Sequence, residues 1–446
     1  MIFMRMSVEG SRLSPSRLHS ATMTASIPAP ADPDEGQPGW NVTLYAVWAG
    51  QMLALIGFSS RVPFLPFYLG DLGVTDVAGQ TLWSGAINAA GAGAMAITAP
   101  IWGLLADRYG RKPMLLRGLF GGALAVALMG LATAPWQLLA LCMLEGTLTG
   151  TVAAAAALVA TSAPRQRLGY ALGMVQTAVF AGASAGPLFG GFAYDRIGPR
   201  ATFALAAAML FGGGVTVAIF ARERFARGAR RAMTDGDAGR WRRFRTSGAF
   251  LFSAAMLTML AAILAVRTIA MAMQPIIPLF VAQLSPNNPE VATLAGIVLG
   301  AAGFTSALAA AYLGRLGDRA GHRRVLAISL VAAGLVYLPM ATVRDPWQLA
   351  VLQALMGVAA GGLIPSANAL IAHLTPIERR GAIFGLTAAL SGVGGFVGPL
   401  LGASLATSLG FRSTFIAAGA LLLAVGALVI GSQTEPSRES SVISHQ

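Results

Sequence analysis

The chain of 446 residues is poor in charge and in cysteine. Only 11% of its residues are charged, whereas a soluble globular domain carries about 25%. Its single cysteine, Cys142, excludes an intrachain disulfide and a metal site built from several thiolates. A soluble domain and a disulfide-linked scaffold are therefore not expected.

The groups that carry enzyme chemistry are also sparse. The four histidines lie in the tails, in a loop or near a helix end, at His19, His322, His373 and His445. No metal cluster and no triad of nucleophile, histidine and acid is apparent. A Walker-type phosphate loop is missing as well. The sequence predicts no enzyme activity, no metal and no cofactor, so any energy used must come from a gradient.

Hydrophobic residues, in contrast, make up 55% of the chain and form long runs between residues 42 and 430. A span needs roughly 20 residues to cross about 30 Å of hydrocarbon. Lipid offers no partner to backbone N–H and C=O groups, so continuous apolar runs must be helical, whereas barrel strands would alternate. These features predict an all-α membrane protein with many spans.

Glycine, proline and charged residues divide these runs into candidate spans. Twelve are expected, near 41–69, 82–106, 113–133, 136–162, 168–194, 201–222, 249–281, 291–316, 324–343, 347–373, 381–407 and 412–432. Their ends are defined to about 2–4 residues.

Positive charge is concentrated in alternate loops. The formal net charge is +13, which could indicate nucleic acid, but twenty basic residues lie in the loops of one side and four in those of the other. The positive-inside rule assigns the first set and both termini to the cytoplasm. Membrane topology therefore explains the charge, and we expect a multi-pass protein of a plasma or bacterial inner membrane that binds no nucleic acid.

The two ends differ from the apolar body. Residues 1–40 are rich in Ser, Pro and Ala and lack the apolar segment of a signal peptide. We expect a disordered cytoplasmic tail there and a second cytoplasmic tail at 434–446.

An internal repeat divides the body into halves. Pro63 to Pro66 recurs at Pro275 to Pro278, and Thr202-Phe203 recurs at Thr414-Phe415, always at an offset of 211 or 212. The simplest account is two six-helix bundles, 41–222 and 249–433, joined by a basic cytoplasmic linker at 223–248. Transporters place their substrate site between such repeats.

The loop between the second and third spans reads Gly-Leu-Leu-Ala-Asp-Arg-Tyr-Gly-Arg-Lys from Gly103 to Lys112. It resembles the signature loop of the major facilitator superfamily, and a weaker copy occurs from Gly314 to Arg323. The resemblance covers the chain from about residue 41 to 431. It implies twelve helices in two pseudo-repeats that move substrate by alternating access.

The resemblance also implies a cytoplasmic latch that holds the two halves together and opens during transport. The residues carried over are Gly103, Asp107, Arg108, Gly110 and Arg111, with Asp318 and Arg319 in the second copy. A carboxylate is also favoured near a helix N-terminus. The alternative is that these charges only end helices and set topology.

A second motif lies in the fifth span. Its small residues and proline are Gly182, Gly186, Pro187, Gly190 and Gly191. The motif resembles that of drug:proton antiporters in the same superfamily, where it is taken to shape a bend and a seal. Residues four apart let helix backbones touch, and proline removes a backbone hydrogen bond. The resemblance favours export, while ordinary helix packing is the alternative.

One carboxylate, Glu145, lies deep inside a predicted span, roughly 14 Å from its outer end at about 1.5 Å per residue. An acid in the membrane is expensive and predicts function. Arg61 lies at a similar depth, and Arg267 is the candidate cation of the second half. We expect Glu145 to bind and release the coupling proton, with Arg61 or a cationic substrate competing for it. A static Glu145–Arg61 pair is the alternative.

One departure from the antiporter branch is clear. That branch usually carries an arginine where Cys142 stands in the fourth span, so its role cannot be transferred. The resemblance implies that spans one, four, seven and ten line the cavity, with Gln353, Ser366 and Asn368 as polar contacts in span ten. Methionines such as Met256 and Met273 either form an adaptable cavity wall or simply fill the core.

The first hypothesis is a proton-coupled exporter of small, amphipathic, drug-like molecules. A proton symporter or facilitator that imports a small nutrient is the alternative. A membrane-embedded enzyme or sensor is disfavoured because the loops are short and no catalytic constellation is present. The expected partners are a small-molecule substrate, protons and the lipid bilayer, and one chain with both halves is expected to work as a monomer.

Overall fold

The computed structural model describes residues 37, 39–223, 254–375 and 379–431. The predicted C-terminal tail, almost all of the N-terminal tail and the predicted linker after Glu223 lie outside these residues. Every regular element described is a helix. The first half contains α1 (Trp40–Ser60), α2 (Leu65–Asp71), α3 (Val77–Tyr109), α4 (Arg111–Met129), α5 (Pro135–Leu148), α6 (Thr151–Ser162), the short η1 (Arg165–Arg167) and α7 (Leu168–Phe220). The second half contains α10 (Ala254–Leu284), α11 (Val291–Ala320), α12 (His322–Met340), α13 (Pro346–Leu374), α14 (Arg380–Leu409) and α15 (Phe411–Gly431).

Within the described residues, 11 helical segments are long and apolar enough to cross a membrane. One of them, Arg165–Phe220, is long enough for two crossings. Its backbone leaves the helical region at Gly198, at φ 78° and ψ 172°, directly before Pro199. A glycine tolerates this left-handed φ, and the proline cannot continue the preceding hydrogen-bond ladder. The predicted twelve spans and the all-α fold are confirmed.

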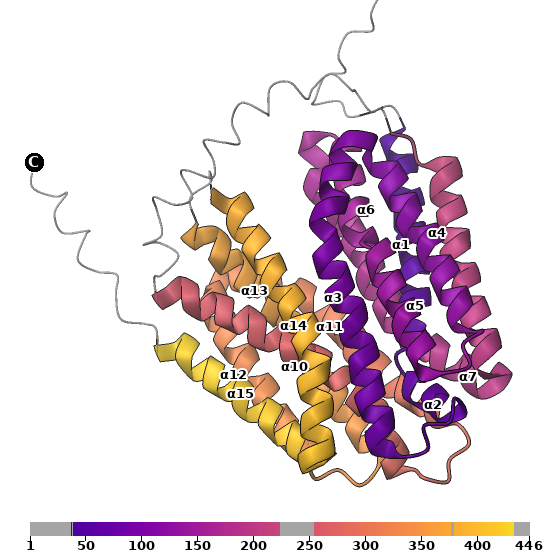
Figure 1. The fold of residues 1–446 in the computed structure, drawn as a ribbon. Helices are drawn as coiled ribbons and strands as arrows, with labels where there is room; N and C mark the ends of the chain where they lie inside the picture. Colours follow the sequence, from indigo (N-terminus) through magenta and orange to yellow (C-terminus); the bar gives the residue numbers. More distant parts are fainter. Residues whose placement is uncertain (1–36, 38, 224–253, 376–378, 432–446) are drawn as a thin grey trace, which may run out of the picture.

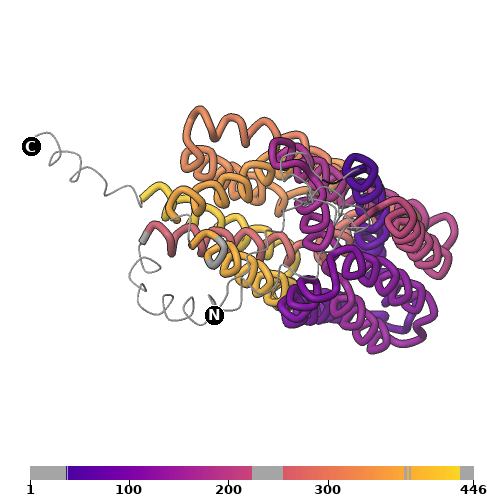
Figure 2. The backbone as a smooth tube through the Cα atoms, turned by 90° about the horizontal axis from the view of Figure 1, so that it is seen from above, coloured from indigo at the N-terminus to yellow at the C-terminus, as the bar shows by residue number. Residues whose placement is uncertain are grey.

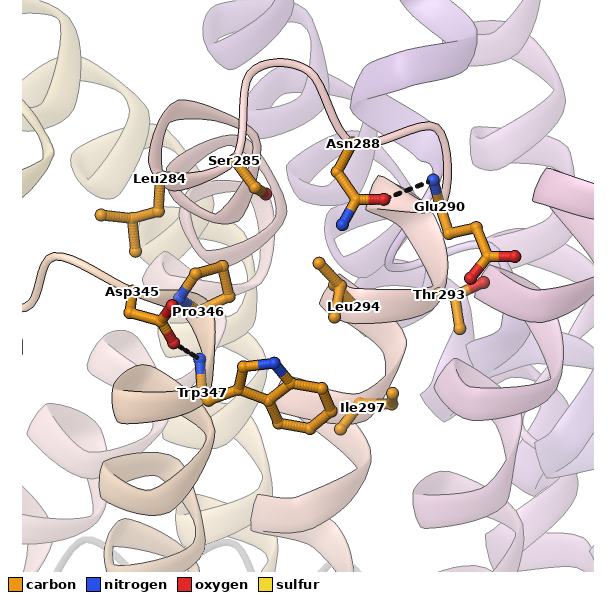
Figure 3. A pocket seen from close by; sticks show the side chains of 10 residues that line it. All are labelled: Leu284, Ser285, Asn288, Glu290, Thr293, Leu294, Ile297, Asp345, Pro346 and Trp347. Atoms are coloured by element: carbon orange, nitrogen blue, oxygen red, sulfur yellow. Dashed lines mark hydrogen bonds between the residues drawn. The ribbon is translucent and has the colours of Figure 1, made fainter.

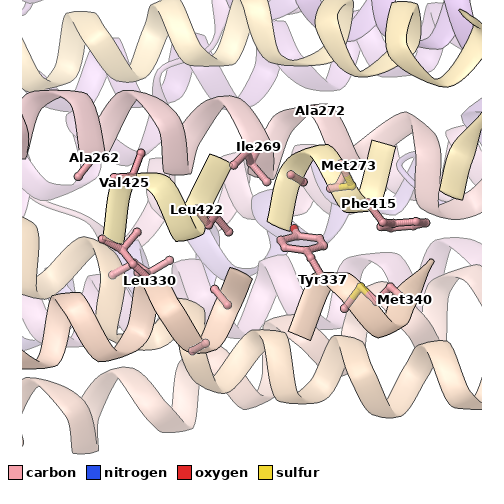
Figure 4. Packing of buried hydrophobic residues seen from close by; sticks show 14 of the residues in the cluster. Ala262, Ile269, Ala272, Met273, Leu330, Tyr337, Met340, Phe415, Leu422 and Val425 are labelled. Atoms are coloured by element: carbon pink, nitrogen blue, oxygen red, sulfur yellow. The ribbon is translucent and has the colours of Figure 1, made fainter. Parts of the chain in front are cut away.

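Each half has its own apolar core. The first core contains Phe64 and Phe203, whose rings meet edge to face at 5.2 Å. The second contains Met273, Tyr337 and Phe415, packed among α10, α12 and α15 (Figure 4). Met256 and Met273 are 0% and 3% exposed in this second core. These two methionines fill the bundle interior rather than a cavity wall.

The halves lie side by side, the first indigo to magenta and the second orange to yellow (Figure 2). α3 packs against α14 and α7 packs against α11. The contact between α3 and α14 is at the end of the molecule that holds α2, and the halves diverge toward the other end (Figure 1). Along α3, Thr81 and Ser84 are fully buried, whereas Ile97 and Leu104 are 75% and 72% exposed. One end of the interface is therefore closed and the other is open.

Candidate functional site

The structure brings Arg61 and Glu145 together. Arg61 follows the last residue of α1, and Glu145 lies in the last turn of α5. One guanidinium nitrogen of Arg61, Nη1, donates to both carboxylate oxygens, 2.7 Å from Oε1 and 2.5 Å from Oε2. The side chains are 16% and 7% exposed, and the thiol of Cys142 lies 3.7 Å from Oε2. A buried ion pair thus joins the first and fourth spans.

Both partners lie beside interruptions of their spans. The first span is broken between α1 and α2, at residues 61–64, and the fourth between α5 and α6. The second break is at Thr149 and Gly150, where Gly150 takes a left-handed φ of 102°. A break inside a membrane span frees carbonyl groups, which need partners in lipid.

Two side chains from neighbouring helices satisfy these carbonyls. Trp102 Nε1 donates to the carbonyl of Thr147 at 2.6 Å, and Arg117 Nη2 donates to that of Thr149 at 2.9 Å. The guanidinium of Arg117 also stacks over the Trp102 ring, 3.5 Å from its centroid. Hydrogen bonds from these two side chains therefore stabilise the break next to Glu145.

The glycine motif of the fifth span packs on the end of α1 that precedes Arg61. A Cβ added to Gly186 or Gly190 would overlap Ser59 or Ser60 respectively. The two backbones therefore touch, as small residues allow in membrane helices. The α7 backbone stays helical through Pro187, and its described departure from helical geometry is at Gly198. The motif holds α7 against the segment that positions Arg61.

Other members of the motif face different helices. A Cβ on Gly182 would lie 2.6 Å from Leu55 Cβ of α1, whereas one on Gly191 would overlap the Ala292 carbonyl oxygen of α11. In the second half, Gly398 and Gly402 of α14 lie 212 residues after Gly186 and Gly190 and repeat their spacing. They behave alike, because they meet Thr268 and Ala272 of α10. The motif thus packs within each half, and Gly191 also brings the two halves together.

The signature loop is tied to its own half. Asp107 and Arg108 are exposed at the end of α3, and no ion pair of Asp107 or Arg111 occurs among the described residues. Instead, the backbone N–H groups of Arg111 and Lys112 each donate to the Glu223 carboxylate at 2.8 Å.

The turn before α4 depends on glycine. Gly110 has a φ of 101°, and a Cβ there would lie 2.9 Å from Glu223 Oε2. Lys112 Nζ donates to the Ala218 and Ala221 carbonyls at the end of α7, at 2.8 and 2.7 Å. The N-terminus of α4 and the C-terminus of α7 therefore cap each other.

The second copy shares part of this arrangement. Arg323, equivalent to Lys112, donates from Nη2 to the Val429 carbonyl at the end of α15, at 2.8 Å. The Asp318 carboxylate lies 3.1 Å from His322 Nε2 and accepts a hydrogen bond from the tautomer that carries a proton on that nitrogen. Arg319 is exposed. Gly103, at the start of the first copy, has open space where a Cβ would lie.

The remaining predicted cavity residues lie in α10 and α13. Arg267 is half-buried and has no ion pair among the described residues. Its Cβ lies 3.0 Å from where a Cβ on Gly394 of α14 would be. Gln353 is 3% exposed and its Nε2 lies 3.9 Å from Met340 Sδ, so it packs between α13 and α12. Ser366 is fully buried without a hydrogen-bond partner in the described structure, and Asn368 is half-buried.

Comparison with known proteins agrees with this architecture. The family model of the Major Facilitator Superfamily matches residues 47–292 and 267–445. The chain belongs to the major facilitator superfamily. The multidrug resistance protein MdtG of Citrobacter koseri is 36% identical over 391 residues, which are 87% of this chain and 95% of that relative. The protein of the same name from Salmonella paratyphi A is 36% identical over 392 residues, with the same coverage.

Solved structures share the facilitator fold. The human organic anion transporter MFSD10 superposes with a TM-score of 0.65 at 19% identity, covering 88% of this chain and 100% of that one. A bacterial homologue of the human lysosomal transporter Spinster, in an inward-facing and occupied conformation, gives 0.69 at 14% identity, covering 89% and 97%. The protein is a multi-pass membrane transporter and not an enzyme.

The sequence did not point to three residues that support this part of the fold. Trp102 and Arg117 bind carbonyls at the break between α5 and α6, and Glu223 binds the first N–H groups of α4. Arg117 had a detectable signal, because a lone arginine inside a predicted span requires a partner. Glu223 is an acid within a strongly basic stretch, which is a weaker signal. Trp102 gave none, since a tryptophan in an apolar run is ordinary.

We expect Gly146→Ala to destabilise the transporter and reduce transport. A Cβ there would overlap the carbonyl oxygen of Gly91 in α3. Overpacking of this kind typically lowers the free energy of unfolding by about 1–3 kcal/mol. The backbone shift would displace Glu145, the preceding residue. Thermal unfolding in detergent measures the change. The matched control is Gly173→Ala in α7, where a Cβ meets open space and helix propensity predicts a gain of roughly 0.5–1 kcal/mol. Equal unfolding temperatures for the two variants would contradict the close approach of α3 and α5.

Proposed function

We propose that this transporter exports small amphipathic, drug-like molecules across a bacterial-type inner membrane in exchange for protons. Its relatives at 36% identity are named multidrug resistance proteins, and the glycine motif of α7 resembles that of drug:proton antiporters. The observation that carries the proposal is the buried pair of Glu145 and Arg61. An ionisable side chain inside a membrane span indicates a functional site, and proton relays in transporters are built from such carboxylates.

In this mechanism Glu145 alternates between two states. When ionised, it is held by Arg61, because a buried charge needs a partner. When protonated, it no longer attracts the guanidinium strongly, and Arg61 is released. A cationic substrate that competes for the Glu145 carboxylate has the same effect. Proton and substrate therefore exclude each other at one carboxylate, which is the requirement for exchange.

The position of the pair links this chemistry to movement. Arg61 lies at the break between α1 and α2, and Glu145 lies one turn before the break between α5 and α6. Hinges are element-terminal residues that absorb changes in backbone angles. Release of the pair would free these two broken spans to adjust. Arg267 and Asn368 are proposed to supply the polar contacts of the second half.

We assign the open end of the interface to the cytoplasm. The basic loops lie at this end, and the positive-inside rule places such loops in the cytoplasm together with both termini. The described conformation would then be inward-open. Asp107, Arg111 and Asp318 would form the latch only when the halves close at this end. We further propose that residues 1–40 and 434–446 are cytoplasmic tails and that residues 223–248 link the two halves on the cytoplasmic side. One chain, which contains both halves, is proposed to work as a monomer.

Flux in everted vesicles tests the direction of transport. With the vesicle lumen more acidic than the medium, so that protons leave the vesicle down their gradient, the proposal predicts accumulation of a cationic amphipathic dye in the lumen against its gradient and collapse of that accumulation by a protonophore. The control is the same membrane without the protein. Downhill movement alone, or coupled flux in the opposite direction, would favour the nutrient symporter or facilitator instead.

A further inference from the structure

The closed end of the interface contains polar contacts between the halves that the transport mechanism above does not use. Asp195, near the middle of α7, reaches the first turn of α11 in the other half. Its Oδ2 accepts hydrogen bonds from the backbone N–H of Thr293 at 2.7 Å and from the Thr293 hydroxyl at 2.6 Å. The two residues are 98 positions apart in sequence.

This geometry is that of a helix N-cap. The first N–H groups of a helix have no partner within it, and a carboxylate from the N-cap residue normally accepts from the second or third. Thr293 is the third residue of α11, which begins at Val291. The residue at the N-cap position, Glu290, makes no side-chain cap of its own. Asp195 therefore supplies from the first half the cap that α11 lacks.

The Glu290 carboxylate is turned elsewhere. It accepts from Arg196 Nη2 at 2.9 Å, so two neighbouring residues of α7 hold the start of α11. Arg196 and Glu290 are 60% and 51% exposed, and an exposed ion pair contributes little. Asp195 and Thr293 are less exposed. The cap, rather than the ion pair, is the main polar contact at this end.

The cap can form only while the two backbones touch. A Cβ on Gly191 would overlap the Ala292 carbonyl oxygen, and one on Gly296 would overlap that of Pro187. Any separation of α7 from α11 at this end would leave the Thr293 N–H to find water. Water has access there, because Glu290 and Thr293 also line a pocket of about 400 Å³ beside Trp347 (Figure 3).

We propose that Asp195 is the outer latch of the transport cycle: it caps α11 only while the outer end is closed, and the cap must break before that end opens. The proposal rests on the alternating access proposed above. Asp107 lies at the opposite end of the molecule, exposed on α3 while Asp195 is engaged. Carboxylates at the two ends would thus be engaged in turn.

The latch is tested by the rate at which a cysteine in the interface is labelled. Ser184 of α7 is 7% exposed and faces Gly303 of α11, so Ser184→Cys, in a Cys142→Ala background, introduces a near-isosteric reporter. A membrane-impermeant maleimide is applied to right-side-out and to everted vesicles. Labelling from the Asp195 side reports opening of that end and needs neither substrate nor a proton gradient.

We expect Asp195→Ala to raise the labelling rate from that side about fivefold, as follows from the loss of a typical helix cap. Asp195→Asn retains a side-chain oxygen and asparagine caps as well as aspartate, so its rate should stay within about twofold of the parent. Arg196→Gln, which breaks the exposed pair, should also stay near the parent rate.

Several results would overturn the latch. An Asp195→Ala rate equal to that of the parent would do so, as would an equally large increase for Arg196→Gln or Asp195→Asn. If Asp195→Ala does not fold, Asp195→Asn and Thr293→Val still test the proposal. Thr293→Val loses the hydroxyl hydrogen bond to Asp195 and must raise the rate. Failure of export in the flux assay leaves these labelling rates unaffected, so the two proposals fail separately.

Discussion

Glu145→Gln is expected to reduce proton-driven efflux to the level of vesicles without the protein. Glutamine has nearly the shape of glutamate and keeps an oxygen that accepts a hydrogen bond from Arg61. Its amide cannot bind and release a proton as a carboxylate does. The variant should therefore fold. Substrate-induced proton release in proteoliposomes, measured with a pH dye, should disappear together with efflux.

The matched control for this variant is Glu290→Gln. Glu290 is also paired with an arginine, but it is 51% exposed at the end of the molecule. We expect coupling to be retained there. Retained coupling in Glu145→Gln as well would show that the Glu145–Arg61 pair is static, which is the alternative for this site.

Arg61→Met is expected to destabilise the protein by about 3–5 kcal/mol, because it leaves the Glu145 carboxylate buried without its partner. Methionine has a similar length and packs in an apolar site. Combined with Glu145→Gln, the same substitution should cost much less, since no buried charge remains. Thermal or denaturant unfolding in detergent of the two single variants and the double variant gives the coupling between the residues.

Arg196→Met is the control for this cycle. Its pair with Glu290 is exposed, and such pairs contribute roughly 0–1 kcal/mol. A loss as large as that of Arg61→Met, or purely additive effects in the Arg61 and Glu145 cycle, would contradict a buried pair. Both interpretations of the pair predict the loss of stability, so only the coupling measurement on Glu145→Gln separates a proton carrier from a static contact.

Much of the site could be predicted because burial imposes strong constraints. Two ionisable residues at similar depth in different spans, Glu145 and Arg61, need partners in hydrocarbon, and each was the nearest candidate for the other. The glycines of the fifth span predicted close helix contact for a similar reason, since only small residues let backbones touch. The helices that these glycines meet were not predictable, because spacing along α7 does not identify the neighbouring helix.

The sequence by itself determined the twelve spans, their division into two repeated halves and the family, because apolar run length, loop charge and motif spacing are local properties. Only the tertiary structure decided that Gln353 packs against Met340, that Glu223 caps α4 and that Asp195 caps a helix of the other half. Asp195 and Thr293 are 98 residues apart. Such contacts depend on how whole helices approach one another, which no local sequence pattern specifies.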